Sequence, residues 1–180
     1  MKLWLARHAR PRVGEGICYG ASDLPAETGA TQAAAHALAQ AIPHGIPVRA
    51  SPLQRCAGLA AALFALRPDL PWQADARLAE MDFGCWEGRP WAEVGEQEFA
   101  RWNADFLDYS FGGRESVRTF MARVEAARGD SARSGPQALW ITHAGVIRAV
   151  GLLAQGVLPL QAGAWPGDAV AFGGWRRLDC

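Results

Sequence analysis

The sequence predicts an α/β fold in three layers (α/β/α), with helices on both faces of a mostly parallel central sheet. Short apolar segments alternate along the chain with Ala- and Leu-rich segments of helical length. The 180 residues, half of them hydrophobic and a fifth charged, suit one soluble domain with a substantial core. No internal repeat, low-complexity tract or linker interrupts the chain. We therefore expect a single domain over residues 1–180.

The expected elements follow from local patterns. In chain order they are a strand over 2–6, a helix over 28–42, a strand over 47–51, a helix to about 66, a weak strand over 72–78, helices over 91–109 and 115–132, a strand over 138–142, a helix over 144–155 and one or two edge strands over 168–178. Ser51 followed by Pro52 predicts a helix N-cap with proline at the first helical position. Residues 80–112 are expected to form a small helical cap over the carboxyl ends of the strands.

Charge and composition exclude several classes of partner. Lys and Arg together number 18, as do Asp and Glu, so no overall field attracts nucleic acid or an anionic membrane. The apolar run after Met1 is too short for a signal-peptide core, and no later segment is long enough to span a bilayer. The four cysteines, including Cys180, are scattered without a C-x-x-C pair, which favours reduced thiols in the cytoplasm. The sequence leaves the oligomeric state open.

Polar residues follow three of the predicted strands at the point where each strand ends. Arg7 and His8 follow the first strand, Arg55 lies one turn into the helix after the second, and His143 follows "ALWIT". A single histidine at a strand end is more often structural, and an arginine in a first helical turn is usually solvated. Ligands of open α/β sheets, however, bind at the carboxyl ends of strands. The recurrence at three equivalent ends therefore favours a binding site.

Such a cluster suits a phosphate dianion. Two guanidinium groups offer forked, permanently charged donors, and the N-termini of the helices that follow Ser51 and His143 add backbone N–H groups. A histidine among arginines stays neutral, because nearby positive charge disfavours imidazolium. The free nitrogen of a neutral imidazole is a nucleophile that can attack phosphorus.

Several segments resemble motifs of the histidine phosphatase (phosphoglycerate mutase-like) superfamily, branch 1. "ARHA" resembles its R-H-G signature, "LPAETGATQA" its L-T-x-x-G-x-x-Q-A helix start, and "SPLQRC" its S-P-L-x-R-A. "LAEMDFGCWEG" is similar to L-x-E-x-x-F-G-x-W-E-G, and "THAGVIRAV" to T-H-G/A-G-x-I-R. The resemblance covers most of the chain and keeps the motifs in order.

The resemblance implies a role for each matching residue. His8 would accept the phosphoryl group, and Arg7, Arg55 and His143 would bind the phosphate. Glu80 would be the general acid that protonates the leaving oxygen. Nothing in this scheme needs a metal ion or a cofactor.

The chain also departs from the family pattern around the outer pocket. Ala9 stands where the signature has glycine, and Arg10 stands where the family often has an acid. The usual S/T-G before the first helix is Tyr19-Gly20. We expect Arg10, Tyr19 and Gly20, together with Ala144, to contact the substrate alongside the phosphate-binding residues.

A phosphomonoester hydrolase is the function that these patterns favour. "GICYGASDLP" resembles a stretch of α-ribazole-5′-phosphate phosphatases, and the chain lacks the long insertions of phosphoglycerate mutases. A cofactor-dependent mutase and a phosphate-binding protein with little turnover remain alternatives. A metal hydrolase that uses His8, His143 and Glu80 is a further one.

An aromatic stripe lies within the predicted cap. Its members are Phe99, Trp102, Phe106 and Tyr109, close to one face of the expected helix. We interpret the stripe as packing rather than as a stacking platform for a substrate base.

Overall fold

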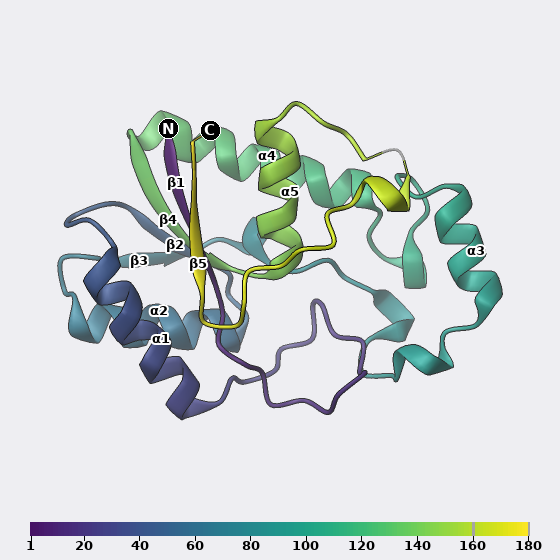
Figure 1. Ribbon diagram of the computed structural model, residues 1–180, viewed down its shortest axis with the longest axis horizontal. Helices are drawn as coiled ribbons and strands as arrows, with labels where there is room; N and C mark the ends of the chain where they lie inside the picture. The colour runs from purple at the N-terminus through teal and green to yellow at the C-terminus, as the bar shows by residue number, and fades with distance from the viewer. Residues whose placement is uncertain (160, 180) are drawn as a thin grey trace.

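The computed structural model describes residues 1–159 and 161–179, and it confirms the predicted fold class (Figure 1). Its strands are β1 (Lys2–Arg7), β2 (Val48–Ala50), β3 (Trp72–Ala74), β4 (Gln137–Thr142) and β5 (Trp175–Asp179). They form one sheet in the order β3-β2-β4-β1-β5, in which only β5, at the edge beside β1, is antiparallel to its neighbour. Cys180 lies outside the described residues.

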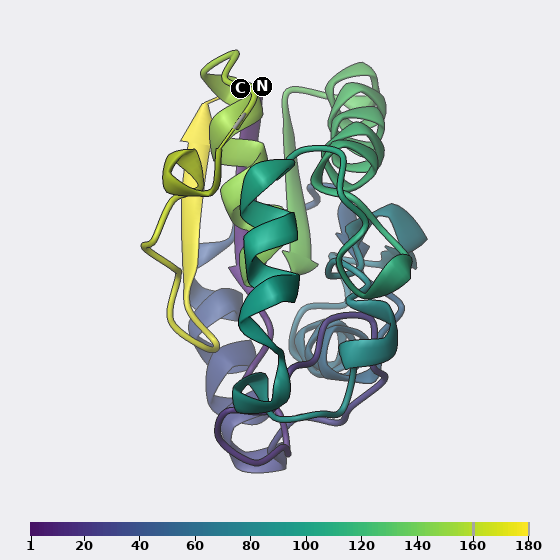
Figure 2. The same cartoon turned by 90° about the vertical axis from the view of Figure 1, so that its right-hand side faces the viewer.

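Helices cover both faces of this sheet. They are α1 (Thr28–Ala41), α2 (Gln54–Leu66), α3 (Glu96–Ala104), α4 (Val117–Ser134) and α5 (Ala144–Ala154). The pair α1 and α2 packs on one face, and the pair α4 and α5 packs on the other (Figures 1 and 2). Helix α3 lies apart from both pairs and lines the cavity at the carboxyl ends of β1 and β4, which is the position of a cap.

Strand β4 shows why the sheet has two separate cores. Ala138 and Trp140 belong to the core under α4 and α5, whereas Leu139 and Ile141 belong to the core under α1 and α2. Successive side chains of a strand point to opposite faces, so an unbroken apolar run fills both cores at once. All four side chains are at most 2% exposed.

The predicted N-cap at Ser51 is wrong. Helix α2 begins at Gln54, and its N-cap position is Leu53. Ser51 directly follows β2, and its main-chain N–H donates to the carbonyl of Ile141 in β4 at 3.0 Å. This bond continues the β2–β4 pairing by one residue, so Ser51 stays in the sheet and its hydroxyl is available to the site.

Other predicted boundaries need correction for local reasons. The predicted strand over 72–78 stops at Ala74, because the side chain of Asp75 accepts from the N–H of Arg77 and caps a 3₁₀ turn. The predicted helix over 91–109 is a 3₁₀ turn followed by α3, with Gly95 as the N-cap of α3. The segment 168–178 contains one strand, which begins only at Trp175.

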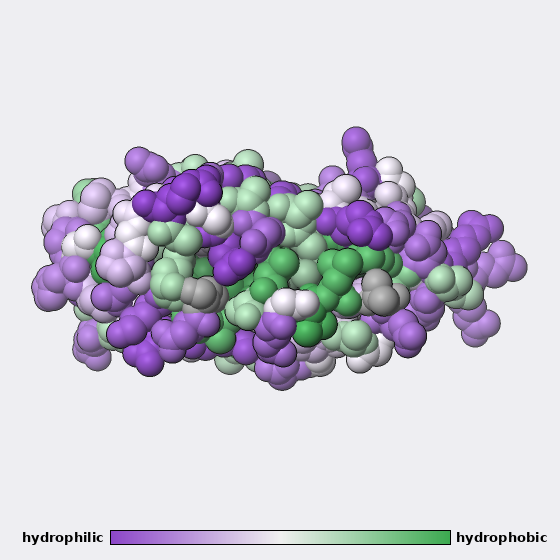
Figure 3. Space-filling model, turned by 90° about the horizontal axis from the view of Figure 1, so that it is seen from above, coloured by the Kyte–Doolittle hydropathy of each residue, from purple (hydrophilic) through white to green (hydrophobic). Residues whose placement is uncertain are grey.

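The surface seen from above is elongated, with apolar side chains gathered over its middle and hydrophilic side chains toward both ends (Figure 3). Among the described residues, no helix has both the length and the apolar character needed to cross a membrane.

Two turns within the cap segment 80–112 approach each other closely at Gly112. This residue has φ +68°, and an added Cβ would lie 1.9 Å from the carbonyl oxygen of Phe83. The neighbouring Gly113 has φ +80°, but an added Cβ there meets nothing within 4 Å.

These two glycines form a matched pair of test sites. Gly113→Ala should cost about 1–2 kcal/mol, the strain of alanine in the left-handed region. Gly112→Ala should cost about 1–3 kcal/mol more, because it also overpacks the contact with Phe83. Urea unfolding of both variants measures the difference. Equal losses would show that the turn moves aside and that the close approach is not a constraint.

Candidate active site

The register of the sheet brings the three polar strand ends together. Ile141 of β4 pairs with Ala6 of β1 on one side and with Ala50 of β2 on the other. Arg7, the last residue of β1, and Ser51, which follows β2, therefore lie at the same edge of the sheet as the end of β4. The convergence expected from the sequence is present.

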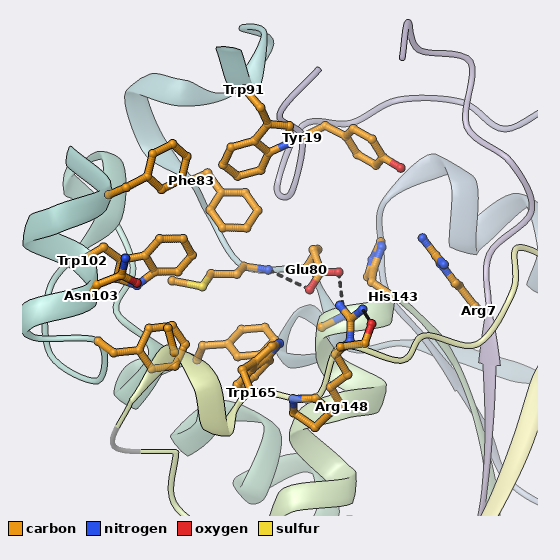
Figure 4. A pocket seen from close by; sticks show the side chains of 18 of the residues that line it. Arg7, Tyr19, Glu80, Phe83, Trp91, Trp102, Asn103, His143, Arg148 and Trp165 are labelled. Atoms are coloured by element: carbon orange, nitrogen blue, oxygen red, sulfur yellow. Dashed lines mark hydrogen bonds between the residues drawn. The ribbon is translucent and has the colours of Figure 1, made fainter. Parts of the chain in front are cut away.

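A cavity of about 620 Å³ opens at this edge. One part of its wall, the cationic half, consists of Arg7, His8, Arg55, His143 and Arg148. The other part, the aromatic half, consists of Phe83, Trp91, Phe99, Trp102, Phe106, Phe120 and Trp165. Glu80 lies between the two halves (Figure 4). The cavity therefore offers an anion site at one end and an apolar surface at the other.

His8 is held as a neutral imidazole with a defined tautomer. It is 2% exposed, and its Nδ1 lies 2.7 Å from the carbonyl oxygen of Ala9. A carbonyl only accepts, so Nδ1 carries the proton and Nε2 keeps its lone pair. Burial, together with the smaller effect of the charges of Arg55 and Arg7, lowers the pKa of His8 to about 3 against the bond to Ala9.

Arg55 is a buried cation, 1% exposed, that uses part of its guanidinium on the protein. Its Nε donates to Nδ1 of His143 at 3.2 Å. Its Nη1 and Nη2 donate to the carbonyl oxygens of Ser22 and Gly20, each at 2.6 Å. An arginine has five N–H donors, so two remain for an anion in the cavity.

His143 lies between Arg55 and His8. Because its Nδ1 accepts from Arg55, the proton of the neutral ring is on Nε2, which lies 2.9 Å from the hydroxyl of Ser51. Its ring centre is 5.0 Å from that of His8. Burial and then the charge of Arg55 lower its pKa well below the usual range. Both ring nitrogens thus contact protein groups, and the expected contact with phosphate stays a prediction.

Arg7 borders the site from the end of β1. Its Nη1 donates to the carbonyl of Val170 at 2.8 Å, and its guanidinium carbon lies 3.8 Å from the ring centre of Phe172. Its Nε is buried and has no hydrogen-bond partner among the described residues. The ring of Phe172 is also 5.5 Å from that of His8, so the chain before β5 covers both residues.

The carboxyl group of Glu80 contacts the N-terminus of α5. Oε2 accepts from the N–H of Gly145 at 2.9 Å, and Oε1 accepts from the N–H of Met81 at 3.2 Å. An added Cβ at Gly145 would lie 2.2 Å from Oε1, so a larger residue here would displace the carboxyl group of Glu80. Burial raises the pKa of Glu80, against the two N–H bonds and the charges of Arg55 and Arg123. A raised pKa suits a group that donates a proton.

The outer residues expected to contact the substrate are less closely gathered. Tyr19 lines the cavity, with its ring centre 5.5 Å from the guanidinium of Arg55. Gly20 is not in the wall but supports Arg55 through its carbonyl. Ala144 is buried at the start of α5, behind the wall. Arg10 is exposed and lies outside the lining, because its carbonyl accepts from the N–H of Glu27 and the chain there runs toward α1.

Sequence reasoning missed Arg148 and gave the aromatic stripe a packing role only. Arg148 is three residues after Gly145 on α5, a spacing that places both on the helix face that lines the cavity. Its Nε and Nη2 donate to the carbonyls of Asp168 and Gly167. Three members of the stripe, Phe99, Trp102 and Phe106, line the cavity and do not only pack.

Metal-ligating side chains are not grouped here. Within residues 1–159 and 161–179, no set of three or more His, Cys, Asp or Glu is placed to hold a metal ion. Cys18 and Cys56 are free and buried, and Sγ of Cys56 lies 3.5 Å from Nε2 of His143.

The lowered pKa of His8 predicts a pH-dependent stability. Between pH 6.5 and about 3 the unfolded chain binds a proton at this position and the native protein does not, so stability falls as the pH falls. From pH 6.5 to 5 the loss due to His8 should approach about 2 kcal/mol. The asparagine of His8→Asn does not titrate, so over the same pH interval this variant should lose about 2 kcal/mol less stability than the wild type.

Urea unfolding at the two pH values measures this difference. The exposed His36 of α1 supplies the control, since His36→Asn should keep the wild-type dependence. If His8→Asn also keeps it, His8 is not held neutral in the folded protein.

Comparisons with known proteins identify the family and the fold. The family model for the histidine phosphatase superfamily (branch 1) matches residues 3–171. A search of curated proteins returns no match. The crystal structure of TTHB049 from Thermus thermophilus is 28% identical, with a TM-score of 0.74 over 99% of this chain and 94% of that chain.

Two further solved structures share the fold at lower identity. The alpha-ribazole phosphatase from Shigella flexneri is 23% identical, with a TM-score of 0.81 over 99% of this chain and 90% of that chain. A mycobacterial glucosyl-3-phosphoglycerate phosphatase is 21% identical, with a TM-score of 0.82 over 98% and 88%. Because the family model spans nearly the whole sequence, the chain belongs to the histidine phosphatase superfamily, branch 1.

Proposed function

We propose that the protein is a phosphomonoesterase that acts through a phosphohistidine at His8. The observation that carries this proposal is the state of His8: a neutral ring whose Nδ1–H is bound to Ala9, whose Nε2 keeps its lone pair, and which lines a cavity with Arg7 and Arg55. A nucleophile of this kind beside two guanidinium groups is suited to attack on a phosphate dianion.

The first step transfers the phosphoryl group to the protein. Nε2 of His8 forms a bond to phosphorus while the bond from phosphorus to the leaving oxygen breaks. The carboxylic acid of Glu80 gives its proton to that oxygen, so an alcohol departs and Glu80 becomes a carboxylate. Arg7 and the two remaining N–H groups of Arg55 stabilise charge on the phosphoryl oxygens.

The second step returns the protein to its starting state. Water attacks phosphorus, the bond from phosphorus to Nε2 breaks, and the carboxylate of Glu80 takes the proton from the water. Inorganic phosphate leaves, and His8 is again a neutral imidazole with Nδ1–H bound to Ala9. Atoms and protons balance without a further group.

The aromatic half supports a flat, apolar leaving group. The two solved structures at 21–23% identity are named for different substrates. At such identities, neither name identifies the substrate of this chain. Phe99 and Trp91 stack with ring centres 6.4 Å apart, and Trp102 and Phe106 stack at 5.5 Å. We propose α-ribazole 5′-phosphate as the substrate, because its aromatic base can occupy this half while its phosphate reaches His8.

Ribose 5-phosphate, which lacks the base, is the matched substrate for this proposal. The kcat/KM for α-ribazole 5′-phosphate should exceed that for ribose 5-phosphate by about tenfold or more, from the apolar area and ring contacts of the base. Phe99→Ala should reduce this ratio while changing the value for ribose 5-phosphate little. Equal values for both substrates would contradict a base site.

The same assays separate the alternatives. Interconversion of phosphoglycerates without release of phosphate would identify a mutase. Phosphate binding without turnover on any ester would identify a binding protein.

Glu80 provides the sharpest test of the mechanism. Glu80→Gln should lower kcat/KM for α-ribazole 5′-phosphate by about 10²–10⁴-fold, because an alkoxide leaving group needs the proton. p-Nitrophenyl phosphate should suffer much less, since p-nitrophenolate is stable as an anion. In the wild type, cleavage of the alkyl phosphate should fall as the pH rises through the raised pKa of Glu80.

His8→Ala and two inhibitors complete this experiment. His8→Ala should abolish turnover of both esters, vanadate should inhibit, and EDTA should not. Equal losses on the two esters in Glu80→Gln would show that Glu80 positions the phosphate rather than donating a proton. Full activity in His8→Ala would exclude the covalent route.

A further inference from the structure

Glu87 has an unusual concentration of hydrogen bonds for a residue outside the cavity wall. Its carboxylate accepts from the main-chain N–H groups of Gly20, Ala21 and Ser22 at 2.9–3.1 Å. It also accepts from the N–H of Phe83 at 3.0 Å and from the hydroxyl of Ser22. One carboxylate therefore holds three consecutive residues of the loop that precedes α1.

The same loop supports Arg55 from its other side. The carbonyl oxygens of Gly20 and Ser22 accept from Nη2 and Nη1 of Arg55, each at 2.6 Å. The N–H groups of both residues thus bind Glu87 while their carbonyls bind the guanidinium. The position of Arg55 depends on this loop, and the loop depends on Glu87.

We infer that Glu87 is a positioning residue that orients the guanidinium of Arg55 toward the phosphate through loop 20–22. This inference rests on the proposed function, in which Arg55 binds the phosphoryl oxygens. Glu87 does not itself line the cavity and so does not touch the substrate.

The environment of Glu87 does not suit the role of general acid. Burial raises its pKa, but the bonds from Ser22, Gly20, Phe83 and Ala21 outweigh burial and hold the pKa below its usual range. An ionised carboxylate accepts all of these bonds at once. The amide of glutamine would direct an NH₂ group at N–H donors and would displace the loop.

A double-mutant cycle tests whether Glu87 acts through Arg55. The variants are Glu87→Gln, Arg55→Lys and the combination, assayed with p-nitrophenyl phosphate and for inhibition by vanadate. Glu87→Gln alone should lower kcat/KM and weaken vanadate binding by about 10- to 100-fold, the worth of one charge-assisted contact. In the Arg55→Lys background it should change either value by less than about threefold.

A merely structural role has a different signature. Loss of folded protein lowers the apparent kcat and leaves KM and the vanadate constant unchanged, whereas a misplaced Arg55 raises both. Asp75→Asn is the matched control: the Asp75 carboxylate also accepts from a main-chain N–H and from arginines, but it is not in the cavity wall. It should lower stability to urea and leave KM unchanged.

The outcomes are distinct. Unchanged KM and vanadate binding in Glu87→Gln, or equal losses in both backgrounds, would overturn the inference. If the wild type binds vanadate but hydrolyses no ester, the proposed function fails. The double-mutant cycle measured by vanadate affinity then still decides whether Glu87 acts through Arg55. If Glu87→Gln does not fold, Ser22→Ala, which removes one of the five donors, should give a smaller loss with the same dependence on Arg55.

Discussion

The buried guanidinium of Arg55 is the constraint on which the rest of the site depends. A cation removed from water must find an acceptor for every donor that does not face a ligand. Arg55 is 1% exposed, and its acceptors are the carbonyls of Gly20 and Ser22 and Nδ1 of His143. Loop 20–22, helix α2 and the end of β4 must therefore meet at one side chain. The tautomer of His143 and the place of Ser51 beside it follow from that meeting.

Near this cation, two carboxyl groups of one short segment have pKa values that are shifted in opposite directions. Glu80 accepts only two main-chain N–H groups, and burial raises its pKa. Glu87, seven residues later, accepts from four N–H groups and one hydroxyl, and its pKa is lowered. Environments that separate the pKa values of neighbouring acids are how a site keeps one protonated and the other ionised. The proposed acid role of Glu80 therefore fits its deeper burial and its fewer hydrogen bonds, whereas the many donors around Glu87 keep that group ionised.

The sequence predicts the phosphate end of the site better than the other end, for a physical reason. Arg7, His8 and His143 lie directly at strand ends, and the parallel sheet brings those ends to one edge without further information. The wall of the aromatic half comes from separate segments of the chain. Phe83, Trp91 and Trp165 therefore do not recur at a regular spacing that could predict them. Only α3 carries a visible pattern, and periodicity alone does not tell a core face from a cavity face. Arg10 is not in the cavity wall, and its contact with the substrate stays a prediction, because a resemblance in sequence does not show where a loop turns.

The two halves of the cavity share one structural part, the turn that contains residues 83–87. The ring of Phe83 lines the aromatic half, while its main-chain N–H is bound to the carboxylate of Glu87 behind Arg55. A substitution that moves this turn therefore affects the surroundings of Arg55 as well as the aromatic half, and residues in contact or in one network do not behave additively. Phe99 on α3 lies in the aromatic half without such a bond to the loop. Under the proposed function, Phe99 would therefore act on the leaving group alone, whereas residues of the 83–87 turn would also affect the phosphate.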